Sequence, residues 1–158
     1  MSASSISDSM ATQFQRSWDM LRDCVHRFPE NEWKDSDIDF LRAPRLVVHA
    51  IEAAEFYCGE SPNGFKWGHR FGDWEGMSLD ELPGQEQVLA YLDEIGEKFE
   101  GWARAMSDED ILGSNDAFPW TGERVLDRIS YVMRHTHQHL GEMGAELRRK
   151  DLPRPKWK

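Results

Sequence analysis

Three of the six histidines in this chain fall within five residues, at His135, His137 and His139. If this segment is an α-helix, each residue advances by about 100°, so His135 and His139 lie one turn apart and His137 points to the other side. Two imidazoles one turn apart can bind the same metal ion, since each nitrogen lies about 2.0–2.1 Å from a bound zinc. The H-x-x-x-H pair therefore predicts two ligands of a divalent metal site, with a third from elsewhere.

The neighbouring residues indicate which way the pair faces. An apolar stripe with helical spacing runs along the same segment, and His139 lies at its edge. We therefore expect the pair to face inward and His137 to face outward. In the alternative, a β-strand, all three histidines would project from one face, but the helical period continues on both sides of them. The stripe consists of Val125, Ile129, Val132, Thr136, Leu140, Met143 and Leu147.

Helical metal motifs that would give a narrower assignment are absent from the sequence. The zinc-protease motif H-E-x-x-H needs Glu after its first histidine, where this chain has Thr136. Di-iron bundles need Glu-x-x-His, and the nearest match is Asp23 before His26. No C-x-x-C-H motif for haem attachment occurs. A site for one metal ion fits these residues best.

The third ligand does not follow from spacing alone. His49 lies in the apolar segment LVVHAIEAAEFY, and a lone histidine on an apolar helix is more often a hydrogen-bonded core residue than a ligand. His26, close to a predicted helix end, and His69, in a segment rich in aromatic residues, are reserve candidates.

Four segments with a helical spacing of apolar residues must position these histidines. Pro29 ends the first segment, and Pro153 and Pro155 prevent extension of the last. The segments cover residues 14–28, 44–58, 88–106 and 121–150.

Polar side chains are available to cap the first and last of these helices. Ser7, Asp8 or Ser9 can accept a hydrogen bond from an amide in the first turn of the first helix. Thr121 can cap the last helix, and Glu123 in its first turn would complement the helix dipole.

Residues 61–83, between the second and third helices, are rich in glycine and aromatic residues and follow neither period. We expect a long loop over one end of the bundle, either functional or an aromatic plug for the core. The second helix is apolar on two sides, which implies two neighbours, and a second subunit can be one of them.

Four amphipathic helices with no strand pattern and no internal repeat predict an all-α four-helix bundle. We expect one domain over residues 1–158, with a core of about 8–150 and a basic tail at 148–158. The tail holds six basic residues and one acid, and is either a solvated end or a strip that binds a partner.

Composition narrows the function classes. A net charge of -10 argues against a nucleic-acid partner, which would require a basic face. There is no stretch of 18 apolar residues and no signal-peptide pattern, so we expect no membrane partner. Cys24 and Cys58 are too few for a disulfide framework and suit a reducing compartment. We therefore expect a cytoplasmic protein.

The run H-x-x-x-H-x-G-E, from His135 to Glu142, resembles the signature of the DinB-like metalloprotein superfamily. The segment LVVHAIEAAEFY resembles the second-helix motif of that family, and FPENEWKDSDIDF resembles its linker. The resemblance covers roughly residues 10–150. It implies a four-helix bundle in which His49, His135 and His139 hold one metal ion with an open coordination position, frequently in a homodimer.

Characterised members of that family include thiol S-transferases and mycothiol-dependent isomerases. Two departures leave the substrate class open. Many members have Arg where this chain has Leu140, and His137 is an extra histidine.

Three neutral imidazoles leave a divalent ion with its full charge and at least one free position, as in catalytic zinc sites. Zinc is the favoured ion, and nickel, iron, manganese or copper also accept such ligands. The ion can activate water for hydrolysis or ionise a thiol. We therefore expect a metal-dependent thiol S-transferase or hydrolase that acts on a small molecule, with a low-molecular-weight thiol as a candidate co-substrate.

Glu52, one turn from His49, and Glu142, close to one turn from His139, are candidates to orient those rings, or else are solvated surface carboxylates. Cys58 is a minor candidate nucleophile, and no catalytic residue can be named from the sequence. The alternative function is a non-catalytic metal-binding or stress-response scaffold that acts through the basic tail.

Overall fold

A computed structural model of the chain describes residues 5–158, and this part is all-helical, as predicted, with no β-strand. No helix in this range is both long enough and apolar enough to span a membrane. The elements in chain order are α1 (Ile6–Arg27), α2 (Glu30–Trp33), the 3-10 helix η1 (Asp39–Leu41), α3 (Ala43–Tyr57), α4 (Gln85–Arg104), α5 (Asp108–Leu112), the 3-10 helix η2 (Pro119–Thr121) and α6 (Val125–Arg149).

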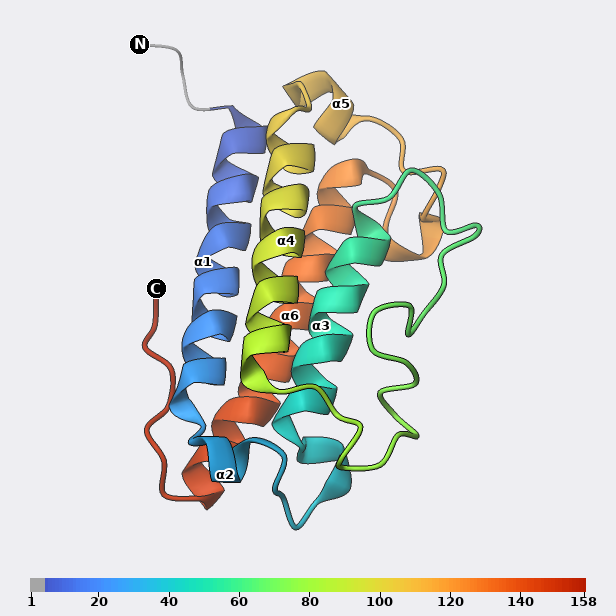
Figure 1. The fold of residues 1–158 in the computed structure, drawn as a ribbon. Coiled ribbons are helices and arrows are strands. Elements are labelled where there is room, and N and C mark those ends of the chain that lie inside the picture. Colours follow the sequence, from blue (N-terminus) through green and yellow to red (C-terminus); the bar gives the residue numbers. More distant parts are fainter. Residues whose placement is uncertain (1–4) are drawn as a thin grey trace.

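The four long helices, α1, α3, α4 and α6, lie side by side (Figure 1). Helices α1 and α3 each pack against both α4 and α6. Helices α3 and α4 run in the same direction, because the segment between them returns along the length of α3 (Figure 1). Residues 61–83, called the aromatic loop below, therefore lie along the side of α3. The prediction that this loop covers one end of the bundle was wrong.

The core between α1 and α4 is built from the aromatic residues of the predicted stripes. The ring of Phe14 stacks on Phe99 with centroids 3.9 Å apart, and both side chains are fully buried. The indole Nε1–H of Trp18 donates to the carbonyl of Leu92 at 2.7 Å. Gly96 permits this close packing, because a Cβ there would lie 2.7 Å from the Trp18 indole. Burial of each such side chain contributes about 1.5–3 kcal/mol to folding.

The predicted N-caps of the first and the last helix were both wrong. Ser5 caps α1 by accepting a hydrogen bond from the amide of Asp8, so Ser7, Asp8 and Ser9 lie inside the helix. The spacing of apolar residues did not mark this extra turn, because its first residues are mostly polar.

The last helix begins later than predicted, with Arg124 as its N-cap. Thr121 belongs to η2, where its hydroxyl donates to the carbonyl of Phe118 at 2.8 Å. Glu123 precedes the helix, and Asp127 supplies the first-turn carboxylate, accepting from the amide of Arg124 at 2.9 Å.

Two helices, α2 and α5, were not predicted. Each spans about one turn, too short for a periodic pattern to show. Trp33 of α2 is buried, and its Nε1–H donates to the carbonyl of Pro83 at 2.9 Å, which ties α2 to the end of the aromatic loop. Ser107 and Asp110 form a capping box at the start of α5.

The C-terminal residues 150–158 leave α6 and run back beside α1 (Figure 1). The amide of Lys156 donates to the carboxylate of Asp23 at 2.8 Å. His137 was predicted to face outward, but its side chain is half-buried. Its Nε2 lies 2.9 Å from the hydroxyl of Ser17 on α1, and its ring lies 6.0 Å from that of Trp157.

Candidate metal centre

Three imidazole rings converge between α3 and α6. Nε2 of His135 lies 3.0 Å from Nε2 of His49 and 3.1 Å from Nε2 of His139. The ligand atoms of the three residues all lie within 4.8 Å of one another. Nitrogens around one tetrahedral ion, at about 2.0–2.1 Å from it, are themselves about 3.3 Å apart. The fold thus brings together the three histidines that the family resemblance implies as ligands.

The two helices set this geometry in different ways. His135 and His139 lie one turn apart on α6, so their rings point into the same space, with centroids 4.5 Å apart. His49 comes from α3, which packs directly against α6, and its ring centroid lies 4.8 Å from each of the other two. His139 is buried and the other two rings are half-buried. One face of the cluster therefore remains accessible from outside.

A carboxylate orients one of the rings. Nδ1 of His139 lies 2.9 Å from the Oε2 atom of Glu142 on the next turn of α6. An ionised carboxylate accepts hydrogen bonds and cannot donate them. The Nδ1 atom of His139 therefore carries the proton, and the lone pair of its Nε2 points at the other two rings. Glu142 therefore has the role expected for it.

Burial keeps the remaining two rings neutral. Burial first, and then the nearby His139, lower the pKa of His49 from 6.5 to about 4. The pKa of His135 also falls to about 4, because of burial first and then its neighbours His139 and His49. Both rings are thus unprotonated at neutral pH, which is the form that binds a metal.

The hydrogen-bonding capacity of the cluster indicates that it fits a cation. Each imidazole nitrogen can make one hydrogen bond in the ring plane, through either its proton or its lone pair. Nε2 of His135, however, faces two other Nε2 atoms. The buried Nδ1 atoms of His49 and His135 have no hydrogen-bond partner among the described residues. Internal hydrogen bonds cannot satisfy three convergent lone pairs, whereas one positive ion can. The three histidines can therefore hold a metal ion.

The reserve histidines lie elsewhere. His26 is exposed on α1, and His69 lies in the aromatic loop with its Nε2 2.9 Å from Glu55. Neither belongs to the cluster of possible ligands found within residues 5–158. Burial raises the pKa of Cys58 to about 11, so its thiol is not an activated nucleophile at neutral pH.

Both expectations for Glu52 were wrong. It does not orient His49, and it is not a surface carboxylate. It is buried, and it accepts hydrogen bonds from the amide of Gly68 and from Nε1–H of Trp74 at 3.1 Å. Its carboxyl group therefore fixes the aromatic loop against α3.

Arg45 of α3 holds the same loop from another side. Its buried guanidinium donates to the carbonyls of Trp74, Glu75 (2.8 Å) and Met77 (3.0 Å). The loop is thus held along the side of α3 (Figure 1), and a second subunit stays a prediction.

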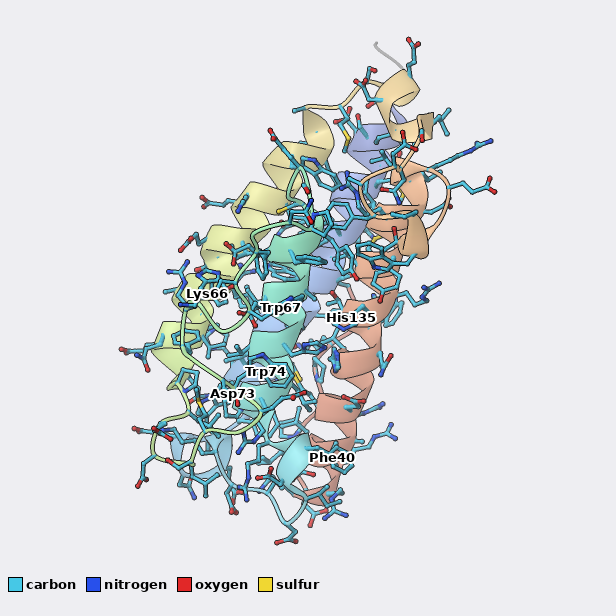
Figure 2. All side chains as sticks on the ribbon, turned by 90° about the vertical axis from the view of Figure 1, so that its right-hand side faces the viewer. Phe40, Lys66, Trp67, Asp73, Trp74 and His135 are labelled. Carbon is cyan, nitrogen blue, oxygen red and sulfur yellow. The ribbon has the colours of Figure 1, made fainter. Side chains whose placement is uncertain are left out.

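As a result of these contacts, the indole of Trp74 lies against His49. The two ring centroids are 4.7 Å apart, and the planes are tilted by 37°. Figure 2 shows Trp74 and Trp67 on the loop where it crosses α3, with His135 on α6 beside them. Trp74 is therefore a wall of the candidate metal centre.

Trp74 lines two pockets. The first, called the loop pocket, has a volume of about 660 Å³ and reaches His49. Trp67 and Trp74 form its aromatic sides, and Lys66 and Asp73 lie at its polar rim.

The second, called the α3 pocket, has a volume of about 380 Å³ and reaches both His49 and His139. Phe40, Leu46 and Trp74 form its apolar sides. Both volumes lie within the size range of small-molecule sites, roughly 300–1,000 Å³.

Sequence reasoning missed Arg45, Trp74 and Phe40 as residues of this site. The one available signal was the density of Trp, Phe and Gly in residues 61–83, which marked the loop as functional or as a plug without indicating its target.

The comparisons with known proteins agree with the histidine cluster. The family whose model matches the chain is the DinB superfamily, and the match extends over residues 13–143, which include all three histidines. No curated protein matches the chain. A match over most of the chain shows the family: this protein belongs to the DinB superfamily.

Proposed function

We propose that the protein is a metal-dependent enzyme of the DinB type that acts on a small molecule by thiol transfer or hydrolysis. In this proposal α1, α3, α4 and α6 form the four-helix bundle of the family, and His49, His135 and His139 are the metal ligands. Zinc is the favoured ion. The observation that carries the proposal is the convergence of three Nε2 atoms at 3.0–3.1 Å contacts, beside two pockets.

The residues of the chain would divide the work as follows. Glu142 fixes the tautomer of His139, and burial keeps His49 and His135 unprotonated. Trp74 excludes water from one side of His49. A divalent ion, when bound, supplies positive charge that favours the ionised form of a thiol or a water molecule.

Metal content measured on the native protein tests this proposal directly. We expect about one equivalent of a divalent metal per chain, because three imidazoles form a single mononuclear site. His139→Ala should lose the metal, since two histidines remain. His137→Ala is the matched control, because His137 lies on the same helix but contacts Ser17 on the opposite side. Its metal content should equal that of the wild type.

Activity is tested by a thiol-consumption screen with glutathione, bacillithiol and mycothiol and a panel of electrophiles. Turnover in the wild type and in His137→Ala, but not in His139→Ala, supports the enzyme. Wild-type protein purified without chelator that holds no stoichiometric metal would contradict the proposal.

A further inference from the structure

A further pocket lies on the side of α6 that faces away from the histidine cluster. It has a volume of about 570 Å³ and is called the tail pocket below. Its walls are Met20 of α1, one side of α6, and Arg154 and Trp157 of the C-terminal residues. None of the three candidate metal ligands lines it. The tail pocket is therefore separate from the site described above.

The C-terminal wall of this pocket is fixed in place. Asp151 takes a left-handed conformation, with φ of 56°, where the chain leaves α6 and turns back beside α1 (Figure 1). The amide of Lys156 then donates to the carboxylate of Asp23 on α1 at 2.8 Å. Pro153 and Pro155 restrict the backbone between these two points. The pocket thus has a defined shape on all three sides.

Two arginines bring positive charge to the pocket. The guanidinium groups of Arg148 and Arg154 line it, and neither makes a hydrogen bond or an ion pair with any other residue in the range 5–158. By contrast, Arg149 and Lys150 at the same end of α6 both pair with carboxylates. The chain holds 29 acidic and 19 basic residues, so acidic partners are plentiful. A guanidinium pair without a partner suits an anionic group, which each fork can bind through two hydrogen bonds.

The remaining walls of the pocket are apolar. Met20 and Leu140 are buried at its base. The indole of Trp157 is 81% exposed at its rim, 6.0 Å from the ring of His137. An aromatic ring with a free face stacks readily on another flat ring. The pocket therefore combines an anion-binding group with a surface for an aromatic body.

Two glycines in the middle of α6 extend the pocket to the helix backbone. Gly141 and Gly144 both line it, and a Cβ added at either would meet no atom within 4 Å. Glycine inside a helix is destabilising relative to alanine. Packing within the chain does not require these glycines, whereas a flat molecule that lies against the helix would use the space they leave.

We propose that the tail pocket is a second small-molecule site, which binds an aromatic anion. Arg148 and Arg154 hold the anionic group, and the ring lies between Trp157 and the glycine-containing side of α6. The volume of about 570 Å³ falls in the range of small-molecule sites, roughly 300–1,000 Å³. This inference goes beyond the proposed function, because the site shares no residue with the metal centre or its two pockets.

Two probes of the same shape test the inference by calorimetry on the full-length protein. The first is 2-naphthoate, an aromatic carboxylate, and the second is 2-naphthamide, its neutral analogue. We expect one molecule of 2-naphthoate to bind per chain. We expect 2-naphthamide to bind about tenfold more weakly, because it forms neither of two exposed ion pairs, each of which contributes about threefold.

The two arginines are then changed one at a time. Arg148→Gln and Arg154→Gln should each raise the dissociation constant of 2-naphthoate about threefold and leave that of 2-naphthamide unchanged. Arg149→Gln is the matched control, because Arg149 is on the same helix but pairs with Glu146 outside the pocket. It should leave both constants unchanged. All three arginines are exposed, so the variants should fold.

Two further measurements locate the bound probe. Gly144→Leu should abolish binding of both probes, since the new side chain fills the pocket and leucine is a good helix former. In a ¹⁵N NMR spectrum, the indole N–H signal of Trp157, identified by its loss in Trp157→Phe, should shift as 2-naphthoate is added.

Equal affinity for the two probes, absence of binding, or a 2-naphthoate affinity that neither arginine variant changes would overturn the inference. Light scattering covers the other occupant, a second copy of the chain. A wild-type dimer that binds no probe and that Gly144→Leu converts into a monomer would assign the pocket to a subunit interface instead.

The titration is repeated on folded protein treated with a chelator, to separate this inference from the proposed function. Binding of 2-naphthoate should persist. Binding that is lost with the metal would place the probe at the histidine cluster, which would overturn this inference and support the proposed function. Protein purified without metal that still binds 2-naphthoate through the two arginines would support this inference and contradict the proposed function.

Discussion

Glu142 lies 2.9 Å from Nδ1 of His139, and this is the one carboxylate that contacts a ring of the histidine cluster within the described residues. The two residues are three positions apart on α6, so the helix itself holds them together. A hydrogen bond to the second nitrogen of a ligand fixes the ring and makes it more basic.

Glu142→Gln should therefore weaken metal binding about 10–100-fold, the usual cost of losing such a partner. Competition with a chelator of known affinity measures this change. Gln138→Ala, an exposed position on the same helix, is the control and should leave the affinity unchanged. An affinity for metal that Glu142→Gln does not alter would show that the carboxylate has no part in the site.

The metal-free protein should lose stability as the pH falls from about 6.5 to about 4. The pKa of His49 and of His135 is lowered from 6.5 to about 4 in the folded chain, chiefly by burial. The unfolded chain therefore binds more protons in this window, which favours unfolding, and the effect is absent above it.

Urea unfolding in the presence of chelator between pH 4 and pH 8 measures this dependence. The variant His49→Gln removes one of the two groups and should reduce the slope, whereas His137→Ala should not. A stability of the wild type that is flat across the window is the opposite result.

Loss of the Arg45 guanidinium should release the aromatic loop. Arg45→Ala leaves the carbonyls of Trp74, Glu75 and Met77 without their donor, at a cost of roughly 1–3 kcal/mol. We expect faster amide hydrogen exchange in residues 66–77 and little change in α1 and α4. Arg104→Ala is the control, because Arg104 lies outside the loop and pairs at the surface with Asp8 and Glu100. Equal exchange in wild type and Arg45→Ala would argue against the clamp.

The two cysteines should react slowly with a thiol reagent. Burial raises the pKa of Cys58 from 9.0 to about 11 and that of Cys24 to about 12, so the thiolate is scarce at pH 8. For Cys58 the lower thiolate fraction alone predicts modification about a hundredfold slower than that of a free thiol. A colorimetric disulfide reagent, with and without denaturant, measures both rates. Rapid modification of the folded protein would reopen Cys58 as a nucleophile.

The pairing of His135 and His139 was predictable from the sequence, because its determinants are local. The spacing of His135 and His139 defines one side of a helix whatever surrounds it. The third histidine of the cluster, His49, required the family resemblance, since no spacing rule relates residues 86 positions apart.

The roles of Glu52 and Trp74 could not be predicted in the same way. Glu52 has the spacing of a residue that could reach His49, yet it bonds to Gly68 and Trp74 instead. That choice depends on where an aperiodic loop lies, which no helical or strand period encodes. The short helices α2 and α5 were missed because a single turn shows no repeat.

The parallel course of α3 and α4 has a consequence for how such a protein can change. The return segment runs back along the length of α3 (Figure 1), and it does so without contributing any of the three imidazoles. Under the proposed function, the metal ligands and part of the selectivity would therefore lie in separate stretches of the chain. A directed-evolution library confined to residues 61–83 would then change which compounds are accepted without altering a metal ligand.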